Sequence, residues 1–180
     1  MQYKCYTGGA IGADTIFEIE SIKKGFDVIA YSFKDHNTTS EHKFILSEYQ
    51  LKEGYEHIKK ANLKLNRNII NISKYVKNLL SRDWFQVKSS DAIYAIGILE
   101  TESIVCGGTG YAIQLAIDEK KPIYFFDQSV NYWHYYDYDT NKFEIFEDIP
   151  TLTHKFAGIG TRKINNNGIN AIKNLIKKAP

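Results

Sequence analysis

Residues 91–98 read Asp-Ala-Ile-Tyr-Ala-Ile-Gly-Ile, a nearly continuous apolar run. A strand buried on both faces of a parallel sheet has this pattern, because helices cover both of its faces. Strand-like and helix-like runs alternate along the rest of the chain, with strands expected at 2–6, 27–33, 122–126 and 155–159 and helices at 15–24, 109–119 and 165–178. The alternation predicts one α/β domain over residues 1–180, Rossmann-like and doubly wound, with a mainly parallel sheet.

Two segments add detail to this outline. Residues 132–138 and 142–146 flank Asp139-Thr140-Asn141 and predict a β-hairpin added to the sheet. Residues 41–87 are mostly helical in period, with breaks expected near residues 61–66 and again near Ser81. Thr39 or Ser40 is the expected N-cap of the first helix in this segment.

Glycine-rich turns stand at the ends of predicted strands and lead into predicted helices. They read Gly8-Gly9-Ala10-Ile11-Gly12-Ala13-Asp14, Gly107-Gly108-Thr109-Gly110 and Gly158-Ile159-Gly160-Thr161-Arg162. Glycine allows a sharp turn and a close approach to a ligand. The free N–H groups and positive dipole end of the following helix favour a phosphate. The set indicates a nucleotide site, whereas turn glycines without any ligand are the structural alternative.

Composition limits the partners. The chain has 23 basic and 21 acidic residues and a net charge of +2, with lysine pairs scattered near predicted helix ends, so nucleic acid is an unfavoured partner. No apolar run is long enough to cross a membrane. Two cysteines, Cys5 and Cys106, make neither a disulfide framework nor a zinc site, the histidines are widely spaced, and no metal or cofactor is expected. No signal peptide is evident at residues 1–5, which predicts a cytoplasmic location.

Several of these segments resemble the SLOG superfamily of Rossmann-like domains. That group includes the DNA-processing protein A fold, the lysine decarboxylase-like phosphoribohydrolases and nucleotide-sensing domains of bacterial defence proteins. Residues 6–14 resemble its S-G-x-A-x-G-x-D turn, and residues 82–94 resemble a segment in which an arginine precedes Ser-Asp and a buried strand. Residues 107–110 fall where the hydrolases carry P-G-G-x-G-T-x-x-E.

The last glycine turn, at residues 156–162, looks like the G-S-R turn that normally opens such domains. The resemblance therefore implies a circularly permuted domain whose opening strand, turn and helix lie at residues 155–178. It is similar to small uncharacterised proteins of phages and bacteria. Permutation is plausible where termini lie close together.

The resemblance implies a cytoplasmic protein that binds a nucleotide-derived small molecule, of the ADP-ribose or cyclic-nucleotide type. It would act as a sensor or a sequestering protein in phage–host conflict, including anti-defence, and form a homo-oligomer. The implied ligand-binding residues are Gly8, Gly9, Ala10, Gly12, Asp14, Arg82, Gly107, Gly108, Thr109, Gly110, Tyr111, Gln114, Gly158, Gly160, Thr161 and Arg162.

Two alternatives remain open. The first is hydrolysis of an N-glycosidic bond in a nucleoside monophosphate or an NAD-derived nucleotide, for which the family uses an arginine and a glutamate. Arg82 matches the arginine, but Gln114 stands at the glutamate position and cannot act as a base. The candidate catalytic residues are therefore Arg82, Asp14, Glu18 and Glu102, with Glu100 beside the last. The second alternative is binding of single-stranded DNA, which the low net charge disfavours.

The singled-out residues also have structural interpretations. Asp14 in a first helical turn complements the helix dipole, Arg82 can pair with Asp83 or Asp91, and Arg162 can form a surface salt bridge. The aromatic run at residues 132–138 suggests base stacking, but alternation in a hairpin favours packing on the core or on a subunit partner.

Overall fold

The apolar run at residues 91–98 lies in the middle of the sheet in the computed structural model, which describes residues 2–180. It forms β4 (Ala92–Gly97), and all of its residues are buried. Its neighbours on both sides, β5 (Ile123–Asp127) and β8 (Lys155–Gly160), are parallel to it. The expectation of a parallel strand buried on both faces is confirmed.

The sheet has eight strands in the order β3-β2-β1-β8-β4-β5-β6-β7. Strands β1 (Lys4–Thr7), β2 (Asp27–Ser32) and β3 (Lys43–Ile45) extend its parallel part beyond β8. On the other side β6 (Tyr132–Asp137) and β7 (Lys142–Phe146) form the predicted hairpin, antiparallel to β5 and to each other. The predicted fold class, a Rossmann-like α/β fold with a mainly parallel sheet and a hairpin addition, is confirmed.

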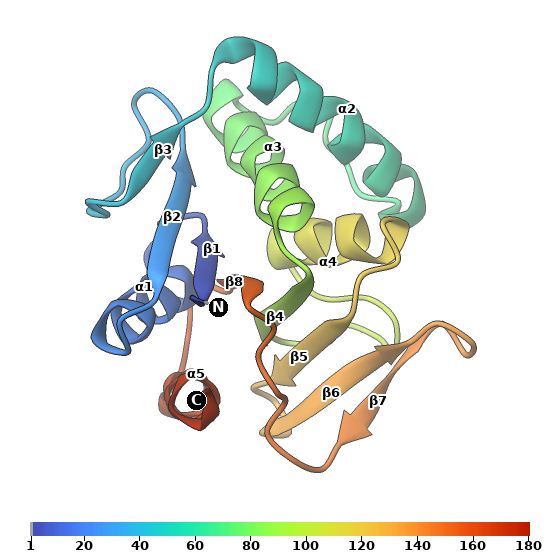
Figure 1. Cartoon of the computed structure of the whole chain (residues 1–180). Helices are drawn as coiled ribbons and strands as arrows, with labels where there is room; N and C mark the ends of the chain where they lie inside the picture. Colours follow the sequence, from blue (N-terminus) through green and yellow to red (C-terminus); the bar gives the residue numbers. More distant parts are fainter. Residues whose placement is uncertain (1) are drawn as a thin grey trace.

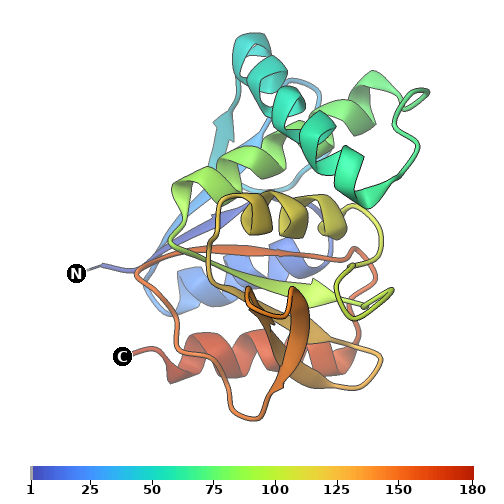
Figure 2. The ribbon, with the colours of Figure 1, turned by 90° about the vertical axis from the view of Figure 1, so that its right-hand side faces the viewer.

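Helices cover both faces of the sheet (Figures 1 and 2). On one face lie α2 (Glu48–Leu65), α3 (Lys74–Ser89) and α4 (Thr109–Asp118), which bury a core that includes Ile58, Trp84 and Leu115. On the other face lie α1 (Ala13–Lys23) and α5 (Asn166–Lys178), which bury a second core around Phe17 and Leu175. Two apolar cores on opposite faces explain why the central strands carry apolar residues on both sides.

Gly158 in β8 is part of this packing. A Cβ atom at residue 158 would lie 2.4 Å from Cγ of Phe17 and 2.7 Å from its Cβ, so α1 approaches the sheet closely only because residue 158 has no side chain. Phe17 is fully buried there. This glycine of the third turn therefore has a packing role in the core.

The segment of residues 41–87 departs from the sequence prediction in three ways. Its start forms the edge strand β3 rather than a helix. The N-cap is Ser47 rather than Thr39 or Ser40, because Ser47 and Gln50 form a reciprocal capping box. Finally, α3 continues through Ser81, whose hydroxyl donates to the Lys77 carbonyl within the helix. The break after residue 65 is confirmed, since α2 ends there with Asn66 in the left-handed conformation.

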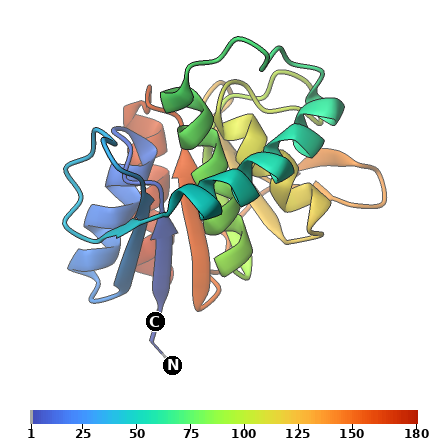
Figure 3. The same ribbon diagram turned by 90° about the horizontal axis from the view of Figure 1, so that it is seen from above.

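The two termini lie at the same end of the molecule (Figures 2 and 3). If the chain is counted from β8 and the short edge strand β3 is left aside, the parallel strands β2-β1-β8-β4-β5 have the order 3-2-1-4-5, which is that of doubly wound folds. This arrangement is compatible with circular permutation, which stays a prediction.

Candidate functional site

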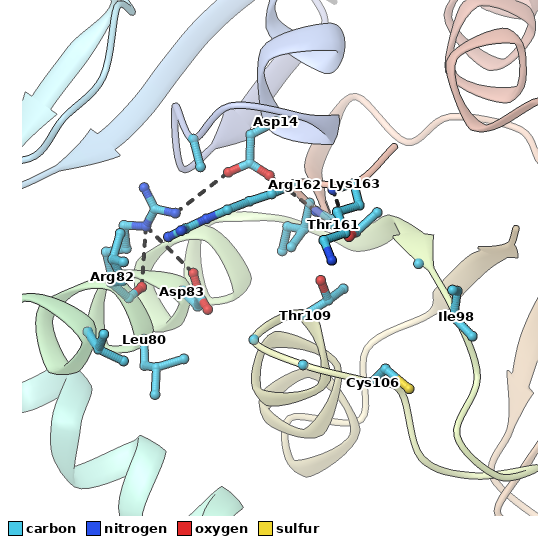
Figure 4. A pocket seen from close by; sticks show the side chains of 18 residues that line it. Asp14, Leu80, Arg82, Asp83, Ile98, Cys106, Thr109, Thr161, Arg162 and Lys163 are labelled. Carbon is cyan, nitrogen blue, oxygen red and sulfur yellow. Dashed lines mark hydrogen bonds and ion pairs between the residues drawn. The ribbon is translucent and has the colours of Figure 1, made fainter. Parts of the chain in front are cut away.

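A cavity of about 450 Å³ opens where β1, β8 and β4 end, beside the first residues of α3 and α4 (Figure 4). Open α/β sheets bind ligands at the carboxyl ends of their strands, and this volume is within the usual range for small-molecule sites. The cavity is lined by Ala10, Asp14, Val76, Leu79, Leu80, Arg82, Asp83, Gly97, Ile98, Cys106, Gly107, Gly108, Thr109, Ile159, Gly160, Thr161, Arg162 and Lys163.

One wall contains a buried ion pair between α1 and α3. Nη2 of Arg82 lies 3.7 Å from Oδ2 of Asp14, and the side chains are 6% and 4% exposed. Asp14 also accepts hydrogen bonds from the N–H groups of Gly8 and Gly160, each at 3.1 Å. The carboxylate therefore ties the first and third glycine turns together and holds Arg82 between them.

Arg82 is fixed from several further sides. Its Nη1 donates to the Gly8 carbonyl, its Nε donates to the Leu79 carbonyl at 3.3 Å, and Nη1 lies 3.2 Å from Nε2 of His36. A Cβ atom at residue 8 would lie 2.5 Å from Cζ of Arg82 and 2.7 Å from Oδ2 of Asp14, so the ion pair occupies the space that a side chain there would need. The predicted pairing of Arg82 with Asp83 is confirmed, since its Nε lies 3.8 Å from Oδ1 of Asp83, and Asp14 is a second partner.

Burial shifts the pKa values of the titratable side chains in this wall. Desolvation raises the pKa of Asp14, and Arg82 opposes that shift. Desolvation also raises the pKa of Asp83 to about 7, with Arg82 lowering it and Asp14 raising it. The pKa of His36 is lowered to about 4 by burial and by Arg82, so its neutral ring can accept from Arg82 at Nε2 while Nδ1 faces the Ser32 hydroxyl at 2.9 Å.

The opposite wall is the glycine turn before α4. Gly107 has φ +65°, and Gly108 follows in the right-handed conformation. Successive residues of opposite hand point their N–H groups into one concave space, which suits an anion. The N–H groups of Gly107, Gly108 and Thr109 make no hydrogen bond with another of residues 2–180, and a Cβ at residue 107 would meet nothing within 4 Å.

The first and third glycine turns, in contrast, pack on each other. At the start of α1, the first N–H group, that of Ala13, donates to the Thr161 carbonyl at 3.0 Å. A Cβ at Gly12 would lie 2.4 Å from that same carbonyl oxygen, so the first and third turns pack directly on each other. The turn at residues 107–109 thus has three consecutive N–H groups without a partner among residues 2–180 and no other turn packed on it.

Arg67, which follows α2, holds the open turn in place. Its Nη1 donates to the Gly107 carbonyl at 2.7 Å, and its Nη2 donates to the Val105 carbonyl at 2.6 Å. Asn62 connects this arginine to α4, because its side chain donates to the Arg67 carbonyl and accepts from the Tyr111 hydroxyl, each at 2.8 Å. The network keeps both carbonyls turned away from the cavity and leaves the N–H groups towards it.

Positive charge comes from the segment after β8. Arg162 and Lys163 are exposed and take part in no ion pair within residues 2–180. Figure 4 shows Thr161 and Lys163 near Thr109, whereas the Arg162 side chain extends toward Arg82 and Asp14. Gln128 fixes the segment by donating to the Lys163 carbonyl at 3.3 Å and accepting from the Asn165 N–H at 2.7 Å. The combination of unpaired cations and free helix N–H groups suits a phosphate.

The remaining lining is apolar. Val76, Leu79 and Leu80 lie three and four residues apart on α3, and Ile98 and Ile159 come from the ends of the central strands. Apolar walls with a few converging polar groups are the general character of small-molecule sites.

The structure brings about half of the ligand-binding residues of the prediction together. Those that line the cavity are Ala10, Asp14, Arg82, Gly107, Gly108, Thr109, Gly160, Thr161 and Arg162; those outside its lining are Gly8, Gly9, Gly12, Gly110, Tyr111, Gln114 and Gly158. Gly8, Gly12, Gly110 and Gly158 allow close backbone packing, because a Cβ at each would lie under 3 Å from another atom.

The two outlying side chains have other partners. Tyr111 reaches Asn62, as described above, and the Gln114 side chain donates to Oδ1 of Asp118 at 2.8 Å. Gly9, which has φ +62°, lines a separate and smaller pocket of about 260 Å³.

The carboxylates proposed for catalysis are dispersed. Glu18 lines the smaller pocket, where it accepts from the Ser40 hydroxyl at 2.7 Å, so it forms no pair with Asp14 in the main cavity. Glu102 is 73% exposed and pairs with Lys142 at 2.6 Å, and Glu100 pairs with Arg67 at 3.1 Å. The acidic residues that line the main cavity are Asp14 and Asp83.

Sequence reasoning missed Asp83, His36, Arg67 and Lys163 as members or supports of the site. The sequence predicts Asp83 as a partner of Arg82, which is confirmed, but not as a lining residue, although its place beside that arginine on a buried helix is a usable signal. No local pattern marks His36 or Arg67, since their partners lie far away in the chain.

Within residues 2–180, no group of three or more His, Cys, Asp or Glu side chains is arranged to hold a metal ion. None of the helices in the same part of the chain combines the length and the apolar character that crossing a membrane requires. No family model, curated protein or solved structure matches the chain. The resemblance to the SLOG superfamily therefore rests on its motifs alone.

Proposed function

We propose that this protein binds a nucleotide-derived small molecule, of the ADP-ribose or cyclic-nucleotide type, in the cavity at the ends of β1, β8 and β4. The observation that carries the proposal is the open turn at residues 107–109. Its three N–H groups have no partner within residues 2–180, and Arg162 and Lys163 line the same cavity without an ion pair. A phosphate group satisfies both requirements at once.

The apolar wall supports the nucleotide part of the proposal. Val76, Leu79 and Leu80 offer a surface for a flat, weakly polar group such as a nucleobase, while the glycine turn takes the phosphate. Because Asp14 is held by two backbone N–H groups and by Arg82, it acts as part of the frame of the site. Binding without chemical change fits a sensor or a sequestering protein. The homo-oligomer and the role in phage–host conflict stay predictions.

Two measurements test the binding proposal. Purified protein is denatured by heat, and the supernatant is analysed by liquid chromatography with mass spectrometry for an intact phosphate-bearing nucleotide. Calorimetric titration with ADP-ribose, cyclic AMP and AMP then gives affinities. Arg162→Glu should weaken binding at least about tenfold, because a charge-assisted contact becomes a repulsion.

Lys173→Glu is the matched control, since Lys173 is an exposed cation on α5, on the other face of the sheet. It makes the same change in charge and should leave the affinities within about twofold. Equal losses in both variants, or no binding of any phosphate-bearing probe to the unaltered protein, would refute the proposed site.

Hydrolysis of an N-glycosidic bond is the second candidate. The observation that favours it is the carboxyl group of Asp83, which lines the cavity and has a pKa of about 7, near the pH at which acid–base catalysis works best. Incubation with AMP, NAD and ADP-ribose, followed by chromatography, separates the two functions. Release of free base that Asp83→Asn abolishes would establish the hydrolase, whereas nucleotides recovered intact support binding alone.

A further inference from the structure

Asp83 presents one unused carboxyl oxygen to the cavity. The residue is 7% exposed, and it lines the cavity from α3. Its Oδ1 accepts from Nε2 of Gln86 at 3.1 Å and lies 3.8 Å from Nε of Arg82. Its Oδ2 takes part in no hydrogen bond within residues 2–180. Because Oδ2 is open to the cavity, a hydrogen-bond donor of a ligand can bind it there in place of solvent.

The charged groups around Asp83 indicate which part of the ligand can bind its free carboxyl oxygen. Arg82 from α3 and Asp14 from α1 lie on its side of the cavity and pair with each other. Arg162 and Lys163 approach from the segment after β8, and α4 presents the neutral Thr109. The α4 side thus contributes no acidic side chain to the cavity, whereas an anion beside Asp83 would be repelled by its carboxylate.

We propose that Asp83 recognises the part of the ligand remote from the phosphate, by accepting a hydrogen bond at Oδ2 from a ligand hydroxyl or amino group. The inference rests on the proposed function and narrows it. The ligand class becomes a phosphate ester that carries such a donor, as a ribose or an aminated nucleobase does. Phosphate esters without a donor on that side leave Asp83 unsatisfied and bind less tightly.

Protonation of Asp83 is coupled to this contact. Desolvation raises the pKa of Asp83 to about 7, Arg82 lowers it and Asp14 raises it further, so the free protein is near the midpoint of this titration at neutral pH. In the ionised carboxylate both oxygens accept hydrogen bonds, whereas protonation turns one of them into a donor. A hydrogen bond from the ligand to Oδ2 therefore stabilises the ionised form of Asp83. Binding therefore releases a proton and becomes tighter as the pH rises through 7.

The test uses the whole chain and ADP-ribose, whose diphosphate stays ionised between about pH 6 and about pH 8. His36, which touches Arg82 from behind, has a pKa of about 4 and stays neutral over the same range. Affinity should increase about tenfold from pH 6 to pH 8, the ratio of ionised Asp83 at those two values. Calorimetry in buffers of different ionisation enthalpy should show proton release on binding at about pH 7.

Asp83→Asn keeps the shape of the side chain and removes the titration. The variant should bind ADP-ribose with the same affinity at both pH values and without proton release. Affinity that falls as the pH rises would mean that the phosphate lies against a protonated Asp83, and it would overturn the inference. An unaltered protein that binds equally at both pH values overturns it too, whereas no binding at any pH refutes the proposed function itself. The measurements on the unaltered protein remain decisive if the variant fails to fold.

Discussion

Asp14→Asn is the substitution that most directly perturbs the frame of the cavity. The amide keeps the shape of the carboxylate and one accepting oxygen, which can still serve the Gly160 N–H. Its NH₂ group, however, faces the Gly8 N–H, which then has no acceptor. The Arg82 guanidinium, which is 6% exposed, loses one of its two carboxylate partners and keeps Asp83. Removing one partner of a buried ion pair costs about 3–5 kcal/mol, because the remaining charge stays desolvated.

Urea unfolding measures this cost. With a slope of roughly 2 kcal/mol per molar urea, the midpoint should fall by about 1.5–2.5 M. Asp27→Asn is the matched control, since its pairing with Lys4 spans 3.9 Å and the side chains are 50% and 36% exposed. That surface pair should contribute less than about 1 kcal/mol.

A double-mutant cycle with Arg82→Gln assigns the effect to the pair. The interaction energy between residues 14 and 82 should exceed about 1 kcal/mol, because the side chains share a buried contact. If Asp14→Asn costs no more than Asp27→Asn, or if the cycle gives an interaction energy near zero, the ion pair does not hold the first and third glycine turns, and that part of the account is wrong.

Three further predictions concern the core, the pH dependence of stability and the open turn. Gly158→Ala should destabilise the fold by about 2–4 kcal/mol in urea unfolding, because its methyl group would overlap Phe17, and an unchanged midpoint would contradict the close packing of α1 on β8. Relative to Asp83→Asn, the unaltered protein should lose free energy of unfolding as the pH rises from about 4 to about 7, because Asp83 keeps its proton longer in the folded protein than in the unfolded chain, and the comparison cancels the opposite contribution of His36. Arg67→Ala should weaken ADP-ribose binding about tenfold or more by releasing the Gly107 carbonyl, with little effect expected from Lys59→Ala, a change of an exposed cation on α2.

The central part of the fold could be predicted from sequence because its signals are local. The apolar run at residues 92–97 requires burial on both faces, and the regular alternation of strand and helix leaves few other topologies. The edge strand β3 was missed because its three residues are all exposed and carry no hydrophobic pattern. The sequence predicts a break near Ser81, but its hydroxyl donates a hydrogen bond to the Lys77 carbonyl within the helix, and α3 continues.

The candidate site was only partly accessible to the same reasoning. The glycine turns have similar sequences. Whether a backbone N–H group in them is hydrogen-bonded depends on how the turns pack in space. Ala13 is satisfied by the third turn, whereas Gly107 faces open space because Arg67 draws its carbonyl away. Likewise, Arg82 pairs with Asp14 in addition to Asp83, because the first turn of α1 and the side of α3 meet at the carboxyl ends of the central strands. Contacts between residues that are far apart in the chain cannot be predicted from the local pattern of a single sequence.

The most direct test of the account is a map of backbone amide shifts by ¹⁵N nuclear magnetic resonance during titration with ADP-ribose. The account predicts that the largest changes fall on the N–H groups of Gly107, Gly108 and Thr109, with smaller ones around Asp83 and Arg162. Changes that centre instead on the smaller pocket around Glu18 and Ser40, or no changes at saturating ADP-ribose, would contradict it.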